Sequence, residues 1–274
     1  MAKPSGAAPK PPDFALRASP RSPLAIPPRA SARGEVAKAS EKMMKTIGLI
    51  GGMSWESSIE YYRIINEAVR GKLGGFHSAK CIMYSVDFAE MEPLQHLGKW
   101  NEATEILIAA ARSVEAGGAD FVIICTNTMH KVADEVQKHL SIPILHIADA
   151  TAQAIKAVGL KRVGLLGTKF TMEEDFYKGR LVQKHNLEVI VPTAEARTVV
   201  NRVIYDELCM GKINPSSKTR YLDIMEHLAK EGAEGIILGC TEIGLLVKKE
   251  ECRVPLFDTT RIHAIAAVEY ALQP

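Results

Sequence analysis

The chain has 274 residues, of which 47% are hydrophobic and 24% are charged, a composition typical of a soluble globular protein. No run approaches the roughly 18 to 20 apolar residues that a membrane helix needs, so we expect no membrane-spanning segment. The formal net charge is +2, but the first 44 residues carry +5 and leave −3 for the rest, which gives no electrostatic reason to expect nucleic-acid binding.

The first 44 residues differ in composition from the rest of the chain. They hold 8 of the 14 prolines and eight basic residues against three acidic ones, without hydrophobic periodicity. Such a segment cannot bury enough apolar surface to offset the entropy lost on ordering. We predict that residues 1–44 form a disordered tail, an over-extended start before Met43 or Met44, or a transit peptide. The expected location is the cytoplasm, or a plastid or mitochondrion if the segment is a transit peptide.

From Lys45 onward, short apolar runs alternate with longer helical patterns. Continuous Ile, Val and Leu strands between helices are typical of parallel sheets covered on both faces, so we predict an α/β protein. The predicted strands are Thr46–Ile50, Lys80–Val86, Asp120–Cys125, Ile142–Ile147, Arg162–Gly167, Leu187–Val191, Gly235–Gly239 and Val254–Phe257. The predicted helices are Ser54–Lys72, Glu102–Ala116, His130–Leu140, Ala150–Val158, Glu173–His185, Val199–Cys209, Ser217–Glu231 and Thr260–Leu272.

Three pairs of similar stretches form an internal repeat. In chain order, KTIGLIGG (45–52) matches KRVGLLGT (161–168), GADFVIICTNT (118–128) matches GAEGIILGCTE (232–242), and IPILHIADATA (142–152) matches VPLFDTTRIHA (254–264). The spacing between partners is nearly constant, which is hard to obtain by chance. We predict two α/β halves of similar design, related by a pseudo-twofold axis, with a cleft between them.

The repeat sets the register of two polar turns. Thr126 aligns with Cys240, whereas Cys125 aligns with Gly239 inside the strand. Ligands of open α/β sheets bind outside the carboxyl ends of the strands, where both turns lie. The register therefore predicts two catalytic positions on opposite sides of one substrate, with Cys125 as a structural residue of the strand.

Five cysteines without a CxxC pair argue against a disulfide framework or a cysteine zinc site. Reduced thiols are the better interpretation.

The stretches GLIGGMSWESS, TNTMH, GCTE and PLFDTTRIHA, taken in order, resemble the aspartate/glutamate racemase family over residues 45–274. The pattern is most similar to the L-aspartate/glutamate-specific branch, in which threonine replaces the first of two catalytic cysteines. The resemblance implies two flavodoxin-like domains, formed by residues 45–142 plus 255–274 and by residues 143–254. It also implies a homodimer that needs no pyridoxal phosphate, metal or nucleotide.

Racemisation requires two acid/base groups on opposite faces of Cα. The resemblance assigns Cys240 to the L-face, and a helix start beside this thiol is suited to lowering its pKa. Thr126 would then serve the other face, although a hydroxyl is a far poorer base than a thiolate. We therefore expect the two faces to be chemically unequal.

Six further positions are candidate substrate-binding residues: Met53, Gln95, Asn127, Thr128, Thr241 and Glu242. The polar groups of Asn127, Thr128 and Thr241 suit hydrogen bonds to the substrate carboxylate. Gln95 lies where related proteins often use a basic residue for the distal carboxylate. Glu242 would orient the substrate ammonium or act on Cys240, unless it is simply an acid at a helix start.

Other interpretations remain open from the sequence. His130 either supports the site from behind or is a helix-start or core histidine, and His263 packs the C-terminal helix. The chain could instead be an amino-acid-binding protein on a racemase scaffold, because binding can outlast the loss of one catalytic cysteine. A third possibility is a related isomerase or lyase acting on hydantoins, maleate or arylmalonates.

Overall fold

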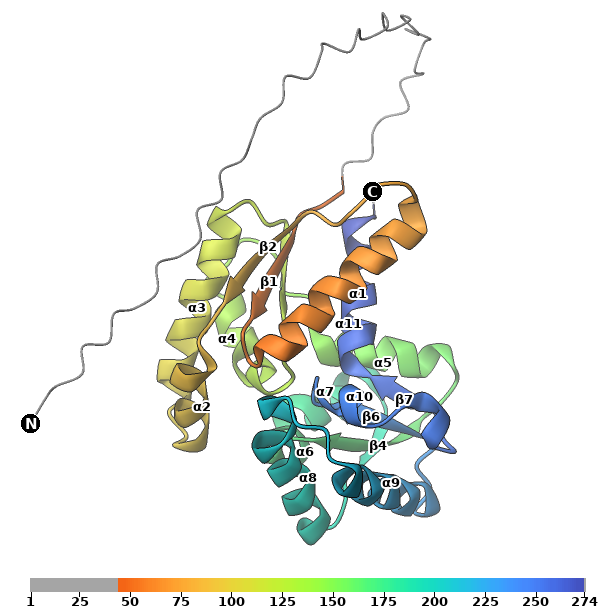
Figure 1. Cartoon of the computed structure of the whole chain (residues 1–274). Coiled ribbons are helices and arrows are strands. Elements are labelled where there is room, and N and C mark those ends of the chain that lie inside the picture. Colours follow the sequence, from red (N-terminus) through yellow and green to blue (C-terminus); the bar gives the residue numbers. More distant parts are fainter. Residues whose placement is uncertain (1–43, 274) are drawn as a thin grey trace, which may run out of the picture. The chain divides into compact units, whose positions relative to one another are not determined.

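Two parallel β-sheets organise residues 44–273, the range that this computed structural model describes (Figure 1). The first sheet has the strand order β2-β1-β3, and the second has the order β5-β4-β6-β7. The strands are β1 (Ile47–Gly51), β2 (Cys81–Ser85), β3 (Phe121–Ile124), β4 (Arg162–Gly167), β5 (Glu188–Ile190), β6 (Gly235–Gly239) and β7 (Leu256–Asp258). The prediction of parallel sheets flanked by helices is confirmed. The predicted extension over 1–44 lies outside the described residues, apart from Met44.

Helices cover the faces of both sheets. Those that follow β1 to β3 are α1 (Trp55–Leu73), α2 (Phe88–His96), α3 (Trp100–Ala116), the 3-10 helix η1 (Thr128–Val132) and α4 (Ala133–Gln137). The remainder are α5 (Ile147–Ala157), α6 (Lys169–Glu173), α7 (Asp175–His185), α8 (Ala194–Asp206), η2 (Leu208–Met210), α9 (Pro215–Lys230), α10 (Ile243–Leu246), η3 (Lys249–Glu251) and α11 (Thr259–Ala271). Within residues 44–273, no helix is both long and apolar enough to cross a membrane.

Strands β1 and β3 of the first sheet are buried on both faces, which explains their continuous apolar sequences, whereas the edge strand β2 is partly exposed. Alternate residues of β3 point to opposite faces: Phe121 and Ile123 pack with α1 and α11, whereas Val122 and Ile124 pack with α3. The second sheet has its own hydrophobic core, to which α5, α7, α8 and α9 contribute.

The two sheets share one topology. β1 lies between β2 and β3, just as β4 lies between β5 and β6. The second sheet adds β7 beside β6, and the matching position beside β3 holds only an isolated bridge between Val122 and Ile144. The internal repeat of the sequence thus corresponds to a repeat of the fold.

The two predicted elements that differ most from the structure lie between β3 and α5, while other elements shift at their ends. The predicted strand Ile142–Ile147 is reduced to the bridge at Ile144, because Pro143 has no N–H to donate and α5 already begins at Ile147. The predicted helix His130–Leu140 is split into η1 and the short α4. Helix α2 was not predicted, because it is short and carries Pro93 in its interior.

The chain passes between the halves near His146 and again at Asp258. The segment before His146 still pairs with β3, since Leu145 N donates to the Val122 carbonyl oxygen. β7 pairs with β6, so the second half extends through Asp258 and the return to the first half begins with α11, not at residue 255. Helix α11 then packs along α1, as Figure 1 shows in blue and orange.

Candidate active site

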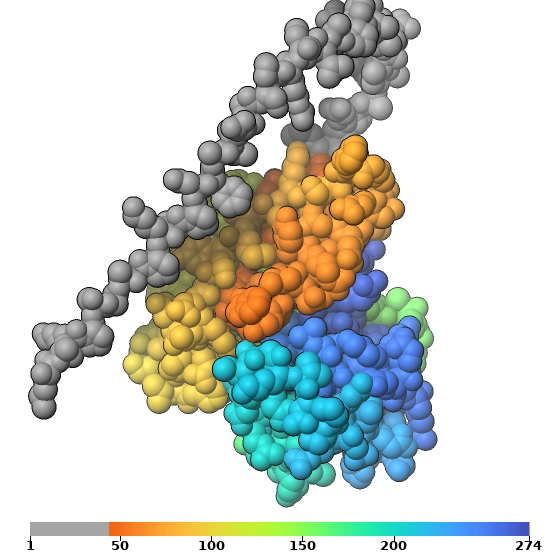
Figure 2. Space-filling view, viewed as in Figure 1, coloured from red at the N-terminus to blue at the C-terminus, as the bar shows by residue number. Residues whose placement is uncertain are grey.

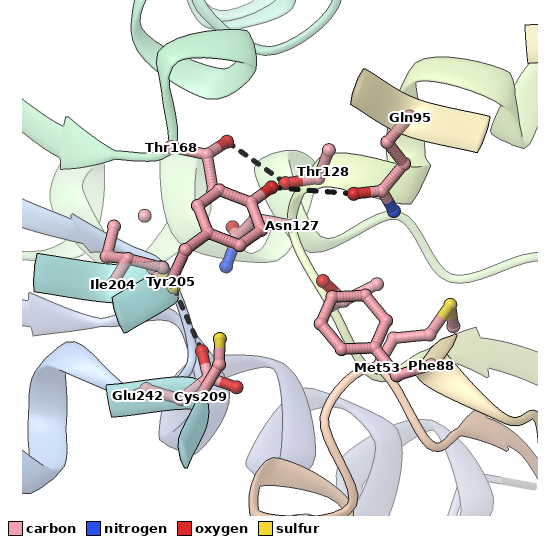
Figure 3. A pocket seen from close by; sticks show the side chains of 13 residues that line it. Met53, Phe88, Gln95, Asn127, Thr128, Thr168, Ile204, Tyr205, Cys209 and Glu242 are labelled. Atoms are coloured by element: carbon pink, nitrogen blue, oxygen red, sulfur yellow. Dashed lines mark hydrogen bonds between the residues drawn. The ribbon is translucent and has the colours of Figure 1, made fainter. Parts of the chain in front are cut away.

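A cavity lies where the carboxyl ends of β1, β3, β4 and β6 face one another (Figure 3). Both halves contribute to its wall. The lining residues are Met53, Phe88, Gln95, Thr126, Asn127, Thr128, Thr168, Ile204, Tyr205, Cys209, Gly239, Cys240 and Glu242.

Seven of the eight predicted site residues line this cavity: Met53, Gln95, Thr126, Asn127, Thr128, Cys240 and Glu242. Thr241 does not. Its hydroxyl donates a hydrogen bond of 2.8 Å to Glu242 Oε2, and it borders a separate groove beside α10. Cys125 lies in the apolar core under α1 and α11, and burial raises the pKa of its thiol.

Several lining residues were not predicted. Thr168 could have been found, because it is the repeat counterpart of Gly52 at the end of the matching strand. Phe88 opens the unpredicted helix α2, while Tyr205 and Cys209 come from α8 and η2. These three have no partner in the repeat, so no sequence signal marked them.

Glu242 is a buried carboxylate next to the Cys240 thiol. It accepts hydrogen bonds from Cys240 Sγ at 2.9 Å, Ser54 Oγ at 2.9 Å and Thr241 Oγ1 at 2.8 Å. Burial, and then the charge of Glu242, raise the pKa of Cys240 well above its usual value. The thiol therefore holds its proton in this closed site, with a carboxylate in position to receive it.

Asn127 presents an unpartnered acceptor at the cavity. Its Nδ2 donates to Thr259 Oγ1 at 3.0 Å, and Thr259 uses its own proton to bond the Leu238 carbonyl oxygen at 2.8 Å. These two hydrogen bonds fix the orientation of the Asn127 amide. Asn127 Oδ1 is buried and has no hydrogen-bond partner among the described residues. A ligand that donates a hydrogen bond would satisfy it.

Thr126 occupies the repeat position of Cys240 and lines the same cavity. Its hydroxyl forms no hydrogen bond with another residue of the described range, and its backbone carbonyl oxygen accepts a bond of 2.8 Å from His130 Nδ1. The hydroxyl is thus free to meet a substrate, while the backbone behind it is held in place.

Three buried histidines form a cluster behind this turn: His130, His146 and His263. The Ile147 N–H donates to His130 Nε2, so His130 is neutral and carries its proton on Nδ1. His263 accepts from the Tyr61 hydroxyl and donates to the Leu145 carbonyl oxygen. Burial lowers all three pKa values, to about 4 for His263 and about 2 for His146. Residues 44–273 contain no group of His, Cys, Asp and Glu side chains arranged to hold a metal ion.

The cavity is closed in this structure. Its volume is about 20 Å³, which is room for about one water molecule. Bonds that cross between the halves close it: Ser54 to Glu242, Thr128 to Thr168 at 3.0 Å, and Tyr205 to Gln95 at 3.5 Å. In Figure 2, the start of α1 (orange) meets the cyan surface around residue 210. Substrate entry therefore requires these contacts to open.

The fold and the cavity define an α/β protein in which two similar halves bring the Cys240 thiol and the Thr126 hydroxyl to one cavity. The family model described as Asp/Glu/hydantoin racemase matches residues 50–267. The chain belongs to this family, and the predicted resemblance and the prediction of an amino-acid racemase are confirmed.

Similar proteins cover nearly the whole globular part. The broad specificity amino-acid racemase RacX of Bacillus subtilis is 26% identical over 230 residues, which is 81% of this chain and 96% of that protein. A crystal structure from Yersinia pestis, provisionally named an Asp/Glu racemase, is 55% identical, has a TM-score of 0.79, and covers 84% of this chain and 100% of its own. An aspartate racemase homologue from Pyrococcus horikoshii is 38% identical, with a TM-score of 0.73 and the same coverage.

Proposed function

We propose that this chain interconverts L- and D-amino acids by two-base proton transfer at Cα, with Cys240 on one face and Thr126 on the other. The observation that carries the proposal is the pairing of these residues. They occupy equivalent strand ends of the two halves and share one cavity.

The reaction starts from the hydrogen-bonded pair of Cys240 and Glu242. Transfer of the thiol proton to Glu242 leaves a thiolate, which then removes the α-proton of an L-amino acid. The carbanion receives a proton on its other face from the Thr126 hydroxyl. Water restores the hydroxyl proton, and Glu242 gives up the proton that it took from the thiol to the hydroxide that remains. A D-amino acid follows the same steps in reverse. Two-base transfer of this kind uses side chains alone, in keeping with the expectation that no cofactor is required.

The polar ends of the substrate have matching groups in the cavity. The α-ammonium donates to Asn127 Oδ1, the acceptor that has no protein partner. This differs from the sequence-based expectation that Asn127 donates to the carboxylate, because Thr259 already takes its N–H. The α-carboxylate meets the backbone N–H groups of the turn after Thr126, since the Thr128 hydroxyl is engaged with Thr168 Oγ1 at 3.0 Å.

The family resemblance gives L-aspartate and L-glutamate as the first substrates to test, and the name of the Bacillus relative supports a wider panel. The homodimer expected from the resemblance stays a prediction, to be measured by light scattering in solution.

The test is deuterium incorporation at Cα from D₂O, followed by NMR for a panel of L-amino acids. We expect wild type to exchange at least one of them, and Cys240→Ala to lose at least about a hundredfold in rate. Thr126→Cys should raise exchange into D-amino acids. Cys125→Ala, a cysteine one residue from the site, is the matched control and should exchange like wild type.

Two outcomes would overturn the proposal. If wild type exchanges no faster than Cys240→Ala on every amino acid tested, the chain is not a racemase of this type, and calorimetric binding without exchange would then support an amino-acid-binding protein. If Cys125→Ala abolishes exchange and Cys240→Ala does not, the assignment of the thiol is wrong.

A further inference from the structure

The cavity wall has no basic side chain. None of the described residues that line it is a lysine, arginine or histidine, and its single carboxylate belongs to Glu242. The cation nearest along the chain to the Thr126–Thr128 turn, Lys131, is already engaged. Its Nζ lies 2.5 Å from Glu174 Oε2 and 3.9 Å from the centre of the Trp100 ring.

The two ends of the cavity differ in their chemistry (Figure 3). Glu242 lies at one end with the thiols of Cys240 and Cys209. At the other end, Figure 3 shows the Tyr205 hydroxyl bonded to the amide of Gln95, with the hydroxyls of Thr128 and Thr168 bonded to each other on its other side. The groups at this second end are uncharged, and each can both donate and accept hydrogen bonds.

Gln95 is a buried amide with weak partners. Only 2% of it is exposed, yet its Nε2 bonds the Met129 sulfur at 3.1 Å, and its Oε1 receives the Tyr205 hydroxyl at 3.5 Å, the outer limit for a hydrogen bond. Thioether sulfur is a weak acceptor. A buried amide in this state gains most from a ligand that both accepts from its N–H and donates to its oxygen.

The charges in the cavity also favour an uncharged substrate side chain. An α-amino acid head is a zwitterion, so an acidic side chain would bring a second negative charge into a wall that already holds Glu242. A desolvated carboxylate without a cationic partner is costly. A side-chain hydroxyl or carboxamide brings no charge and matches both functions of Gln95.

We propose that the preferred substrates are amino acids whose side chains end in an uncharged hydroxyl or carboxamide group, which hydrogen-bonds to Gln95. Acidic amino acids are then poorer substrates. This inference rests on the proposed racemase function and names its substrate class. It departs from the sequence-based expectation that aspartate and glutamate are the substrates.

The test compares isosteric pairs by Cα deuterium exchange: L-asparagine with L-aspartate, and L-glutamine with L-glutamate. We expect kcat/KM to favour the amide by about tenfold or more in at least one pair. Gln95→Arg supplies the missing cation and should change the ratio of kcat/KM for the amide to kcat/KM for the acid by a similar factor in favour of the acid. Gln183→Arg adds the same charge at an exposed position of α7 and should leave the ratio unchanged.

A second variant covers the case in which arginine prevents folding at this buried position. Gln95→Leu is close in size and apolar, and we expect it to lower the ratio of kcat/KM for the amides to kcat/KM for L-alanine about tenfold. Acids exchanged faster than amides by wild type would overturn the inference and leave the racemase function standing. An amide preference unchanged in folded Gln95→Leu would overturn the role of Gln95. Failure of every amino acid to exchange would instead reject the proposed function.

Discussion

In the proposed mechanism, proton removal at the L-face depends on the carboxylate of Glu242. Burial raises the pKa of Cys240, so the thiol does not ionise by itself near neutral pH. The 2.9 Å bond to Glu242 offers a local route for its proton. The carboxylate thus has two opposing effects, because its charge disfavours a free thiolate while its oxygen makes proton transfer possible.

Replacing Glu242 with glutamine tests this role. We expect Glu242→Gln to lower exchange of L-amino acids at pH 7 by about 10²- to 10⁴-fold, since an amide cannot take the thiol proton. The residual rate should rise with pH as the thiol ionises into solvent. Exchange is measured from pH 6 to pH 10, with the exposed Glu250→Gln as control. A parallel drop at every pH, without the rise, would contradict a role in proton transfer.

Cys125 provides a comparison with Cys240, because its thiol packs in the core and does not line the cavity. Its side chain is fully buried with Ile47, Phe121 and Ile123. We expect Cys125→Ala to lower the free energy of unfolding by about 1–2 kcal/mol through lost packing. Urea denaturation measures this change, and the exchange rate of the folded protein should stay at the wild-type value. Loss of exchange without loss of stability would show that Cys125 takes part in the reaction and would contradict a packing role alone.

At the scale of an element, the turn from β1 to α1 depends on Gly52. This residue has φ +89°, and an added Cβ would lie 2.1 Å from the Val86 carbonyl oxygen. The close approach of Val86 holds the turn that carries Met53 to the cavity and Ser54 to Glu242. No residue with a side chain fits at this position without moving backbone.

A pair of glycine variants separates this clash from backbone strain. Gly118 also has a positive φ, +97°, but an added Cβ there would meet nothing within 4 Å. We expect Gly118→Ala to cost about 1 kcal/mol of stability from backbone strain alone. Gly52→Ala should cost about 3 kcal/mol or more, or displace the turn and lower exchange. Equal costs in thermal or urea denaturation would show that the contact with Val86 is unimportant.

The strand ends were predictable because each is encoded locally and repeated. The apolar runs of β1, β3, β4 and β6 are followed by short polar turns, and the repeat sets Thr126 against Cys240. The direction of a side chain within a turn was not predictable, because tertiary contacts determine it. Thr241 follows Cys240 directly, yet its hydroxyl bonds Glu242 and its side chain does not line the cavity. Tyr205 lines the cavity only because α8 packs beside it, and no local sequence pattern predicts that packing.

At the scale of the whole molecule, the histidine cluster lies where the chain passes from the first half to the second. His130 and His146 precede α5, and His263 belongs to α11. Because their pKa values are lowered on folding, the folded state binds fewer protons than the unfolded chain below about pH 6.5. Stability is therefore full above that pH and falls as the pH drops toward the folded pKa values.

Urea denaturation between pH 7.5 and pH 5 measures this dependence. We expect the free energy of unfolding to fall below pH 6.5, by up to about 1.4 kcal/mol per pH unit for each histidine that stays neutral in the folded state. The exposed His227→Gln should keep the wild-type slope. A stability that is flat over this range would mean that the cluster takes up protons without unfolding.

The unequal pair of Thr126 and Cys240 has a consequence for the direction of the reaction. The two enantiomers of an amino acid have the same free energy in water, so the equilibrium constant of racemisation is unity. Detailed balance then requires kcat/KM to be equal in both directions, however different the hydroxyl and the thiol are. The asymmetry can appear only in how each direction divides between kcat and KM, and in which proton transfer shows the isotope effect. Any lasting excess of one enantiomer in the cell must therefore come from a second reaction that consumes the other.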